Sequence, residues 1–181
     1  SRRVIPAQLG FLAIYNPSLG KGDESLEDQL VYYSSLEDRA GGRRRRHGDK
    51  TISEAERREE KNEKLRHIGL AQGMVEFARS FSEGKPVDVV ETHKSRMIIH
   101  ELEADWWILA SIELTQIPTT YVVPATKGKP AEKKEIVEFS SREVKPPILL
   151  LGDLLRAHAT LLLHNDSSLA ALFQRTKRSE F

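Results

Sequence analysis

The segment 106–114 restricts the fold of this chain most, because it has the composition of a strand and is apolar on both faces. Successive side chains of a strand point to opposite faces of a sheet. Trp107 and Leu109 would therefore share one face, while Ala110 would lie on the other. A strand of this kind needs cover on both sides. We expect it to lie inside a sheet that has helices on both of its faces.

Four more runs have the β-branched and aromatic residues that are typical of strands, and turn residues bound them. They span residues 9–15, 29–34, 87–92 and 96–102. The first two would form an antiparallel pair. The connections between the last two and the segment 106–114 are short, which predicts a meander of hairpins.

A long helix is predicted for residues 54–80, because Ser53 and Glu56 have the spacing of a capping box and Glu, Arg, Lys and Ala follow. From Leu65 onward, apolar residues cover well over half of the helix circumference. A helix that packs on one sheet face needs only a stripe. This helix would therefore have a second surface to cover, which points to a partner protein.

The remaining elements lie in the C-terminal third. Pro147 is placed to begin a helix over residues 148–163, whose apolar run of about sixteen residues is shorter than the roughly twenty that a bilayer requires. We expect this helix to be buried. A last helix would run through Leu172. Residues 115–146 are rich in Pro and Lys, and a protruding hairpin and a loose loop are equally allowed there.

The expected order of elements is β-β-α-β-β-β-α-α, in one α+β domain that spans residues 1–181. A chain of 181 residues supplies one sizeable core rather than two. Residues 36–52 show no periodicity that would support a packed element, so we expect an Arg-rich loop insertion there.

The sequence offers no recognisable catalytic or metal site. It has no cysteine, which removes disulfides, thiolate zinc sites and cysteine nucleophiles and fits a cytoplasmic protein. No pair of its six histidines has ligand spacing supported by carboxylates, and no nucleophile or phosphate-binding motif occurs. We therefore expect neither bond-making catalysis nor a metal or cofactor.

The sharpest electrostatic feature is a run of four arginines, Arg43, Arg44, Arg45 and Arg46. Between residues 39 and 66, eleven basic residues stand against six acidic ones. Contact with anionic lipid would gain about 1 kcal/mol per basic residue near the membrane. A solvated loop and a nucleic-acid contact are the alternatives. The second is disfavoured because no aromatic residue lies between the arginines and the net charge of the chain is only +1.

Several stretches resemble the opening longin domain of the vacuolar fusion protein CCZ family. They are residues 11–20, 30–33, 63–72, 77–82 and 92–96, together with Trp106 and Trp107. The order of elements is that of a longin domain as well. The likeness covers about the first 115 residues and the terminal helices, whereas the Arg-rich stretch and the 115–146 connection depart from the family pattern.

The resemblance implies a subunit of the Mon–CCZ heterodimer, the guanine nucleotide exchange factor that activates the Rab GTPase of late endosomes and vacuoles. In that family this domain pairs with the equivalent longin domain of the Mon subunit, and the pair holds the GTPase. The implied location is the cytoplasm, peripheral to the late endosomal or vacuolar membrane. A longin adaptor or scaffold domain in vesicle trafficking, without exchange activity, is the alternative from another class.

We expect a partner-binding surface that engages the GTPase to lie around the first helix and the turn after the first strand, because helix positions 64, 68, 72 and 75 lie on one side. The candidate residues are Asn16, Pro17, Lys64, His67, Ile68, Ala71, Gln72 and Val75. The alternative is that these residues only contact the Mon subunit or form the core.

Overall fold

The computed structural model describes residues 3–20, 28–36, 54–80, 88–124, 132–165 and 167–176. In this part of the chain, the strands of the main sheet are β1 (Gln8–Tyr15), β2 (Leu30–Ser35), β3 (Val89–Glu91), β4 (Ser95–Glu103) and β5 (Trp106–Glu113). A separate pair of strands is β6 (Thr115–Val123) and β7 (Glu132–Ser140). The helices are α2 (Glu54–Ser80), α3 (Pro147–Asn165) and α4 (Leu169–Thr176). Nearly all of the insertion expected at 36–52 lies outside the described residues.

The main sheet is antiparallel throughout and has the strand order β2-β1-β5-β4-β3. Strand β1 lies between β2 and β5, with Leu12 opposite Ala110 and Ala13 opposite Leu109. Strands β3, β4 and β5 form the expected meander. The predicted α+β class and the five-stranded antiparallel sheet are therefore confirmed.

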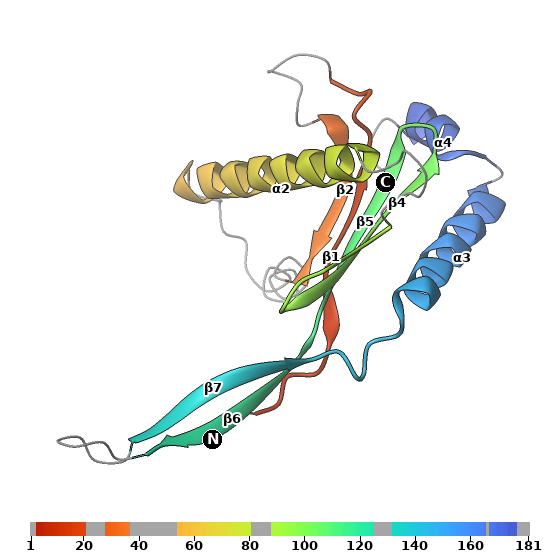
Figure 1. Cartoon of the computed structure of the whole chain (residues 1–181). Coiled ribbons are helices and arrows are strands. Elements are labelled where there is room, and N and C mark those ends of the chain that lie inside the picture. The colour runs from red at the N-terminus through yellow and green to blue at the C-terminus, as the bar shows by residue number, and fades with distance from the viewer. Residues whose placement is uncertain are drawn as a thin grey trace, which may run out of the picture.

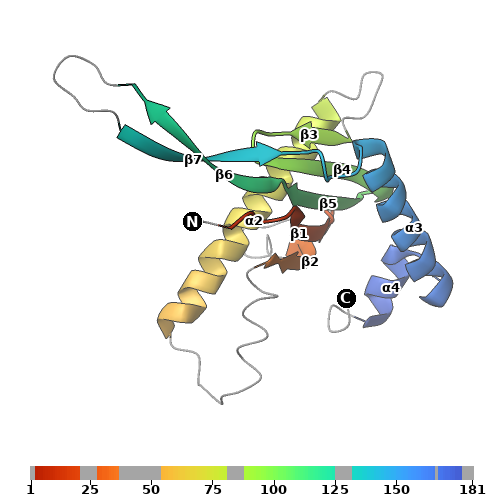
Figure 2. The same cartoon turned by 90° about the horizontal axis from the view of Figure 1, so that it is seen from below.

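Helices cover both faces of the sheet, as the composition of β5 predicted. Helix α2 crosses one face and α3 lies against the other (Figures 1 and 2). The α2 side holds a core that includes Ala13 and Leu109, while the α3 side holds Ala110 and Leu151. In β4 the neighbouring residues Ile98 and Ile99 point to opposite sides, and both are 0% exposed.

The expectation of a buried C-terminal helix is wrong. Of the residues of α3, only Leu151 is buried, and Leu150 and Leu154 pack beside it against the sheet. Ile148 and Leu163 are 73% and 81% exposed. The sequence showed that α3 is apolar on most of its surface, but the sheet covers only the side that rests on it.

A carboxylate of β4 holds the C-terminal helices in place. Glu103 Oε1 accepts hydrogen bonds from the backbone N–H of Leu169, at 2.9 Å, and from His158 Nε2, at 3.3 Å. Leu169 is the first residue of α4, so Glu103 satisfies an amide that the helix itself leaves unpaired. The ring of Phe173 in α4 meets Trp106 edge-on at 5.7 Å. The end of the β4–β5 hairpin therefore contacts both α3 and α4.

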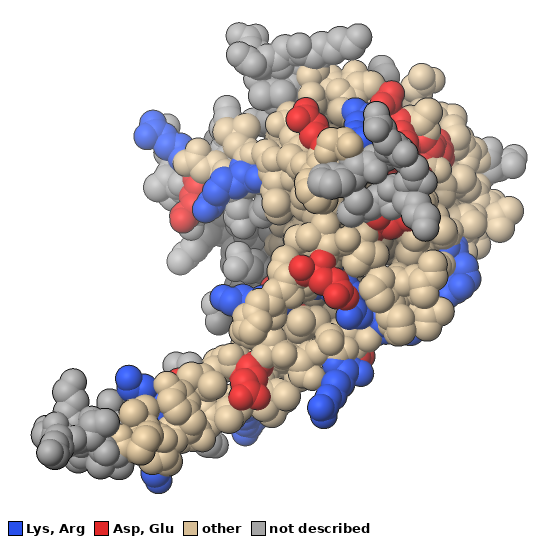
Figure 3. Space-filling model, viewed as in Figure 1, with Lys and Arg blue, Asp and Glu red and all other residues tan. Residues whose placement is uncertain are grey.

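Strands β6 and β7 form a two-stranded ribbon that projects away from the main sheet (Figures 1 and 2). At its base, Ile5 forms a bridge with Gln116. The ribbon carries exposed Tyr121 and Ile136, and Figure 3 shows charged side chains of both signs scattered along it. Isolated two-stranded ribbons are only marginally stable in water.

Two substitutions in β4 test whether both faces of the sheet are covered. We expect Ile98→Ala and Ile99→Ala each to lower the free energy of unfolding by about 2–5 kcal/mol, because each removes fully buried methyl groups on a different face. Urea unfolding of both variants measures this. Ile117→Ala in the ribbon, where the side chain is 36% exposed, should lower the free energy of unfolding much less. A small loss at Ile98 would show that α3 does not cover its face.

Candidate partner-binding surface

Helix α2 rests on the sheet only through its C-terminal half. Its buried residues are Ile68, Ala71, Met74, Val75 and Ala78. The side chains described before residue 68 are exposed, and this half of the helix extends beyond the edge strand β2 (Figures 1 and 2). At the other end, Arg79 forms an ion pair with Asp105 at 2.8 Å and lies 5.5 Å from the Trp107 ring centre.

Three large apolar side chains described in α2 are partly exposed. Leu65, Leu70 and Phe77 are 41%, 44% and 44% exposed. With about 3.6 residues per turn, Leu70 and Phe77 flank the buried stripe on one side, and Leu65 and Gln72 flank it on the other. We call the first side the pocket margin and the second the turn margin.

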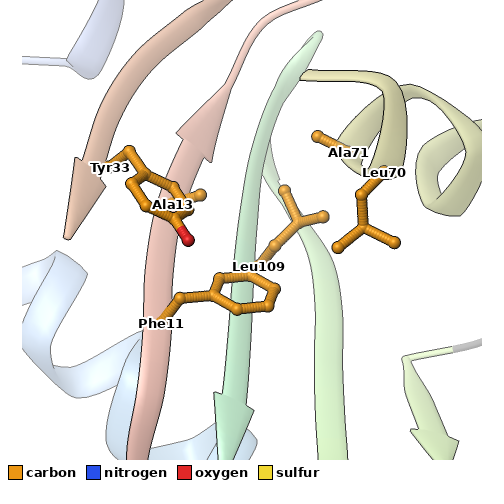
Figure 4. A pocket seen from close by; sticks show the side chains of 6 residues that line it. All are labelled: Phe11, Ala13, Tyr33, Leu70, Ala71 and Leu109. Atoms are coloured by element: carbon orange, nitrogen blue, oxygen red, sulfur yellow. The ribbon is translucent and has the colours of Figure 1, made fainter. Parts of the chain in front are cut away.

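An apolar pocket lies along the pocket margin, between α2 and the sheet. It is lined by Phe11, Ala13, Tyr33, Leu70, Ala71 and Leu109. Side chains from β1, β5 and α2 converge there (Figure 4). The rings of Phe11 and Tyr33 stack at 5.9 Å, and both residues are only half-buried. The pocket is therefore a small apolar recess, of about 10 Å³, that Leu70 and Ala71 bound on the side of the helix.

A polar cluster lies on the turn margin. The side-chain oxygen Oε1 of Gln29 accepts a hydrogen bond from the Tyr15 hydroxyl, at 2.6 Å, and one from Gln72 Nε2, at 2.9 Å. Gln29 Nε2 donates to the carbonyl of Gly20 at 3.1 Å. Burial raises the pKa of the Tyr15 hydroxyl above its ordinary value. Through Gln29, this cluster joins β1, the following turn and α2.

The turn after β1 is built on Asn16. Its Oδ1 accepts hydrogen bonds from the backbone N–H and the hydroxyl of Ser18, at 2.9 and 2.6 Å. The backbone N–H of Asn16 donates to the carbonyl of Gln29 at 2.8 Å. Asn16 is buried, whereas Pro17 beside it is half-buried. Pro17 is therefore the side chain of this pair that a partner could reach.

Three of the candidate partner-binding residues belong to the core. Ile68, Ala71 and Val75 are 2%, 3% and 1% exposed, because they face the domain's own sheet. They cannot also form an exposed contact surface, so the alternative that they build the core applies to them. Gln72 lies on the turn margin, and Pro17 is half-buried in the turn after β1.

The other candidates are described in part or not at all. Lys64 and His67 lie in α2, but their side chains are outside the described part of the structure. The four arginines Arg43, Arg44, Arg45 and Arg46 lie entirely outside it. In the described ranges, no group of three or more His, Asp or Glu side chains is arranged to hold a metal ion. None of the described helices is long and apolar enough to cross a membrane.

Apart from Gln72, the sequence alone did not identify the residues that form the two margins. Phe11 and Tyr33 are apolar residues in strands, a pattern that also fits the core. Leu70 belongs to the same apolar arc as Val75, and periodicity does not show which part of such an arc the sheet covers. Gln29 could have been noticed in the sequence, because it is a polar residue at the start of an apolar strand.

Comparison with known proteins identifies the family. The sequence model that describes the "First Longin domain of INTU, CCZ1 and HPS4" matches residues 9–127, which is more than half of the chain. The chain belongs to this family. The resemblance to the CCZ longin domain is therefore confirmed, and the sheet with its two helical layers is consistent with a longin domain.

Several curated relatives have the name "Vacuolar fusion protein CCZ1 homolog". The protein of Danio rerio is 27% identical over 143 residues, which is 79% of this chain and 24% of the relative. That of Xenopus tropicalis is 30% identical over 62% of this chain and 19% of its own length. That of Oryza sativa subsp. japonica is 34% identical over 34% of this chain. The chain thus spans about a quarter of the relatives it matches, or less.

Stability at high pH tests the environment of Tyr15. The raised pKa means that the unfolded chain ionises first, near pH 10. The resulting contribution to folding stability is complete below that pH and is lost as the pH rises towards the folded-state pKa. We expect Tyr15→Phe to unfold more easily at pH 7 and to lose less additional stability than the parent between pH 9 and 11. Urea unfolding at each pH measures the stability of both proteins. If the two lose equal stability between pH 9 and 11, the prediction is contradicted.

Proposed function

We propose that this domain is part of a heterodimeric guanine nucleotide exchange factor that activates the Rab GTPase of late endosomes and vacuoles. Membership of the family and the names of the relatives support a role in vacuolar fusion and membrane trafficking. The observation that carries the proposal is the exposed apolar side of α2 beside an apolar pocket. Such a surface fits a protein partner better than a small substrate.

Exchange by this route requires no nucleophile in the domain. The assembly need only bind the nucleotide-free GTPase more tightly than the loaded one, by displacing the switch segments that hold magnesium and phosphate. The task of this chain is then to present two surfaces in a fixed geometry. One holds the second subunit, and the other contacts the GTPase.

The two margins of α2 differ in character, which assigns them different partners in this proposal. Along the pocket margin, the recess beneath Leu70 is lined by apolar side chains and by the ring of Tyr33. Permanent interfaces are the more apolar class, so we place the longin domain of the Mon subunit there. The turn margin combines Leu65 with Gln72 and is more polar. Mixed surfaces are typical of transient contacts, so we place the GTPase there.

A matched pair of substitutions tests this assignment. Leu70→Asp and Leu65→Asp make the same chemical change at 44% and 41% exposed sites on opposite margins. We expect Leu70→Asp to prevent assembly with the Mon subunit, because it places a charge in an apolar interface. Leu65→Asp should leave assembly intact and slow catalysed nucleotide release at least tenfold, about 1.4 kcal/mol of transition-state stabilisation. Gel filtration and release of a fluorescent nucleotide measure the two effects.

The outcomes separate the alternatives. Assembly of Leu70→Asp at the parent's affinity would place the Mon subunit elsewhere. Unchanged nucleotide release with Leu65→Asp would remove the GTPase from the turn margin. If the parent heterodimer binds the GTPase but does not accelerate release, the adaptor or scaffold function in vesicle trafficking is the better conclusion.

The arginine run provides a second, separable proposal, that of peripheral attachment to an anionic membrane. It is supported by the sequence alone, through Arg43, Arg44, Arg45 and Arg46. We expect changing all four to Ser to weaken binding to phosphatidylserine liposomes, and to do so most at low salt, because screening reduces surface electrostatics. Nucleotide release in solution should not change. Co-sedimentation measures binding, and equal binding of the parent to neutral and anionic liposomes would contradict the proposal.

A further inference from the structure

The ribbon formed by β6 and β7 has a free edge. In the described part of the chain, β6 and no other strand pairs with β7. The outer edge of β6 already bonds to the N-terminal segment at its base, because Gln116 exchanges two backbone hydrogen bonds with Ile5, at 3.0 and 2.8 Å. The outer edge of β7 is different. A row of unpaired backbone N–H and C=O groups is a template to which another strand can add.

The register of the ribbon shows which backbone groups of β7 face this edge. In an antiparallel pair, residues that bond to their opposite number alternate with residues whose N–H and C=O groups face away. Gln116 bonds outward to Ile5, so Phe139, which lies opposite Gln116, faces outward on the β7 side. The pairing runs without a shift, so Val137, Glu135 and Lys133 also present their N–H and C=O groups at the free edge.

The open part of this edge is residues 133–138. At its inner end, the ring of Phe139 meets the ring of His93 edge-on, at 5.2 Å between ring centres, and lies 5.7 Å from Lys94 Nζ. From there towards its tip, the ribbon projects away from the main sheet (Figures 1 and 2). A further strand can therefore lie beside residues 133–138.

One face of the ribbon carries the side chains that select the occupant. Lys134, Ile136 and Glu138 alternate along β7, so they share a face, and all three are exposed. Across the ribbon, Lys134 lies opposite Tyr121, and Glu138 lies opposite Ile117. Neither charge therefore has an opposite charge directly across its own ribbon.

A second β7 strand, running antiparallel, matches this pattern. With Ile136 of the two copies opposite each other, Lys134 of each copy lies opposite Glu138 of the other, because the contact is two-fold symmetric. In the same alignment Glu135 lies opposite Val137 of the second copy. The backbone groups of both residues face outward, so they can exchange two hydrogen bonds. Backbone and side chains thus favour the same alignment.

Other symmetric alignments of this stretch are less favourable. Those that keep outward-facing residues opposite one another are centred on a residue. Centring the contact on any charged residue of the stretch places that charge opposite its own copy, and like charges directly opposite are destabilising. Centring it on Val137 pairs no opposite charges within residues 133–138. The charges, which at most edges prevent pairing, here select the alignment centred on Ile136.

We propose that β7 is a docking edge for a second copy of this chain. The two ribbons join in one antiparallel sheet with the strand order β6-β7-β7-β6. This contact stabilises the ribbon, because a sheet needs three or more strands for independent stability. The interface is small, which suits a reversible dimer. It involves no residue of α2, and it does not rest on the proposed exchange function.

Two charge reversals test the proposal in the full-length protein. Lys134→Glu places two acidic side chains opposite each other at both ends of the contact, and Glu138→Lys places two basic ones there. Each variant alone should therefore repel itself. A mixture of the two variants pairs opposite charges again at both ends. Sedimentation velocity measures self-association, and co-precipitation of differently tagged chains measures the mixed pair.

We expect the parent to form a reversible dimer and each single variant to associate at least tenfold more weakly, a loss of about 1.4 kcal/mol. Mixing the two variants should restore association to nearly the parent's level, which an unfolded variant could not do. Lys133→Glu is the matched control. It makes the same change at the neighbouring exposed residue, which this alignment places opposite Phe139 rather than opposite a charge. It should change the dissociation constant by no more than about twofold.

A parent that stays monomeric at every soluble concentration would overturn the proposal. A mixture of the two variants that associates no better than either alone, or an equal effect of Lys133→Glu, would reject the alignment and the docking edge with it. If Leu70→Asp abolishes self-association and the charge reversals do not, the contact lies on α2 and the proposal fails. These measurements need neither the Mon subunit nor the GTPase, so they can fail while Leu65→Asp still slows catalysed nucleotide release.

Discussion

The fold depends on a sheet whose central strands are buried on both faces. Ile98 and Ile99 are neighbours in β4, yet each is fully covered, by α3 on one side and by α2 on the other. Neither helix can leave without exposing one of these faces to water. This requirement fixes α2 and α3 on opposite sides of the sheet, and it is why the exposed apolar side chains of the two helices point in opposite directions.

The sequence predicted the elements that are set by local pattern. The apolar faces of β5 indicated the two helical layers, and the boundaries of α2, Glu54–Ser80, agree with a capping box at its start. Exposure was harder to predict. Both α2 and α3 are apolar on much of their circumference, and periodicity cannot show how much of that arc the sheet covers. The prediction was therefore wrong about the burial of α3.

The expectation of a partner-binding site around α2 stays a prediction, and the structure corrects several of the residues chosen for it. The choice of α2 rested on its wide apolar arc and on the side of the helix that positions 64, 68, 72 and 75 share. Among the chosen residues, the structure places Ile68, Ala71 and Val75 in the core. The pocket margin could not be found from the sequence, because Phe11 and Tyr33 come together only when β1 pairs with β2 and α2 crosses above them. Such a surface depends on tertiary contacts between distant segments.

The position of β1 in the sheet has a consequence for how the chain folds. Its partners in β5 are about 100 residues away in sequence, as for Leu12 and Ala110, whereas β3, β4 and β5 pair with near neighbours. Contacts between distant residues must overcome a larger loss of chain entropy and form later. The meander should therefore form first, and the β1–β2 pair should join it in a later step. The length of the Arg-rich segment between them affects the speed of folding much more than the stability of the folded state.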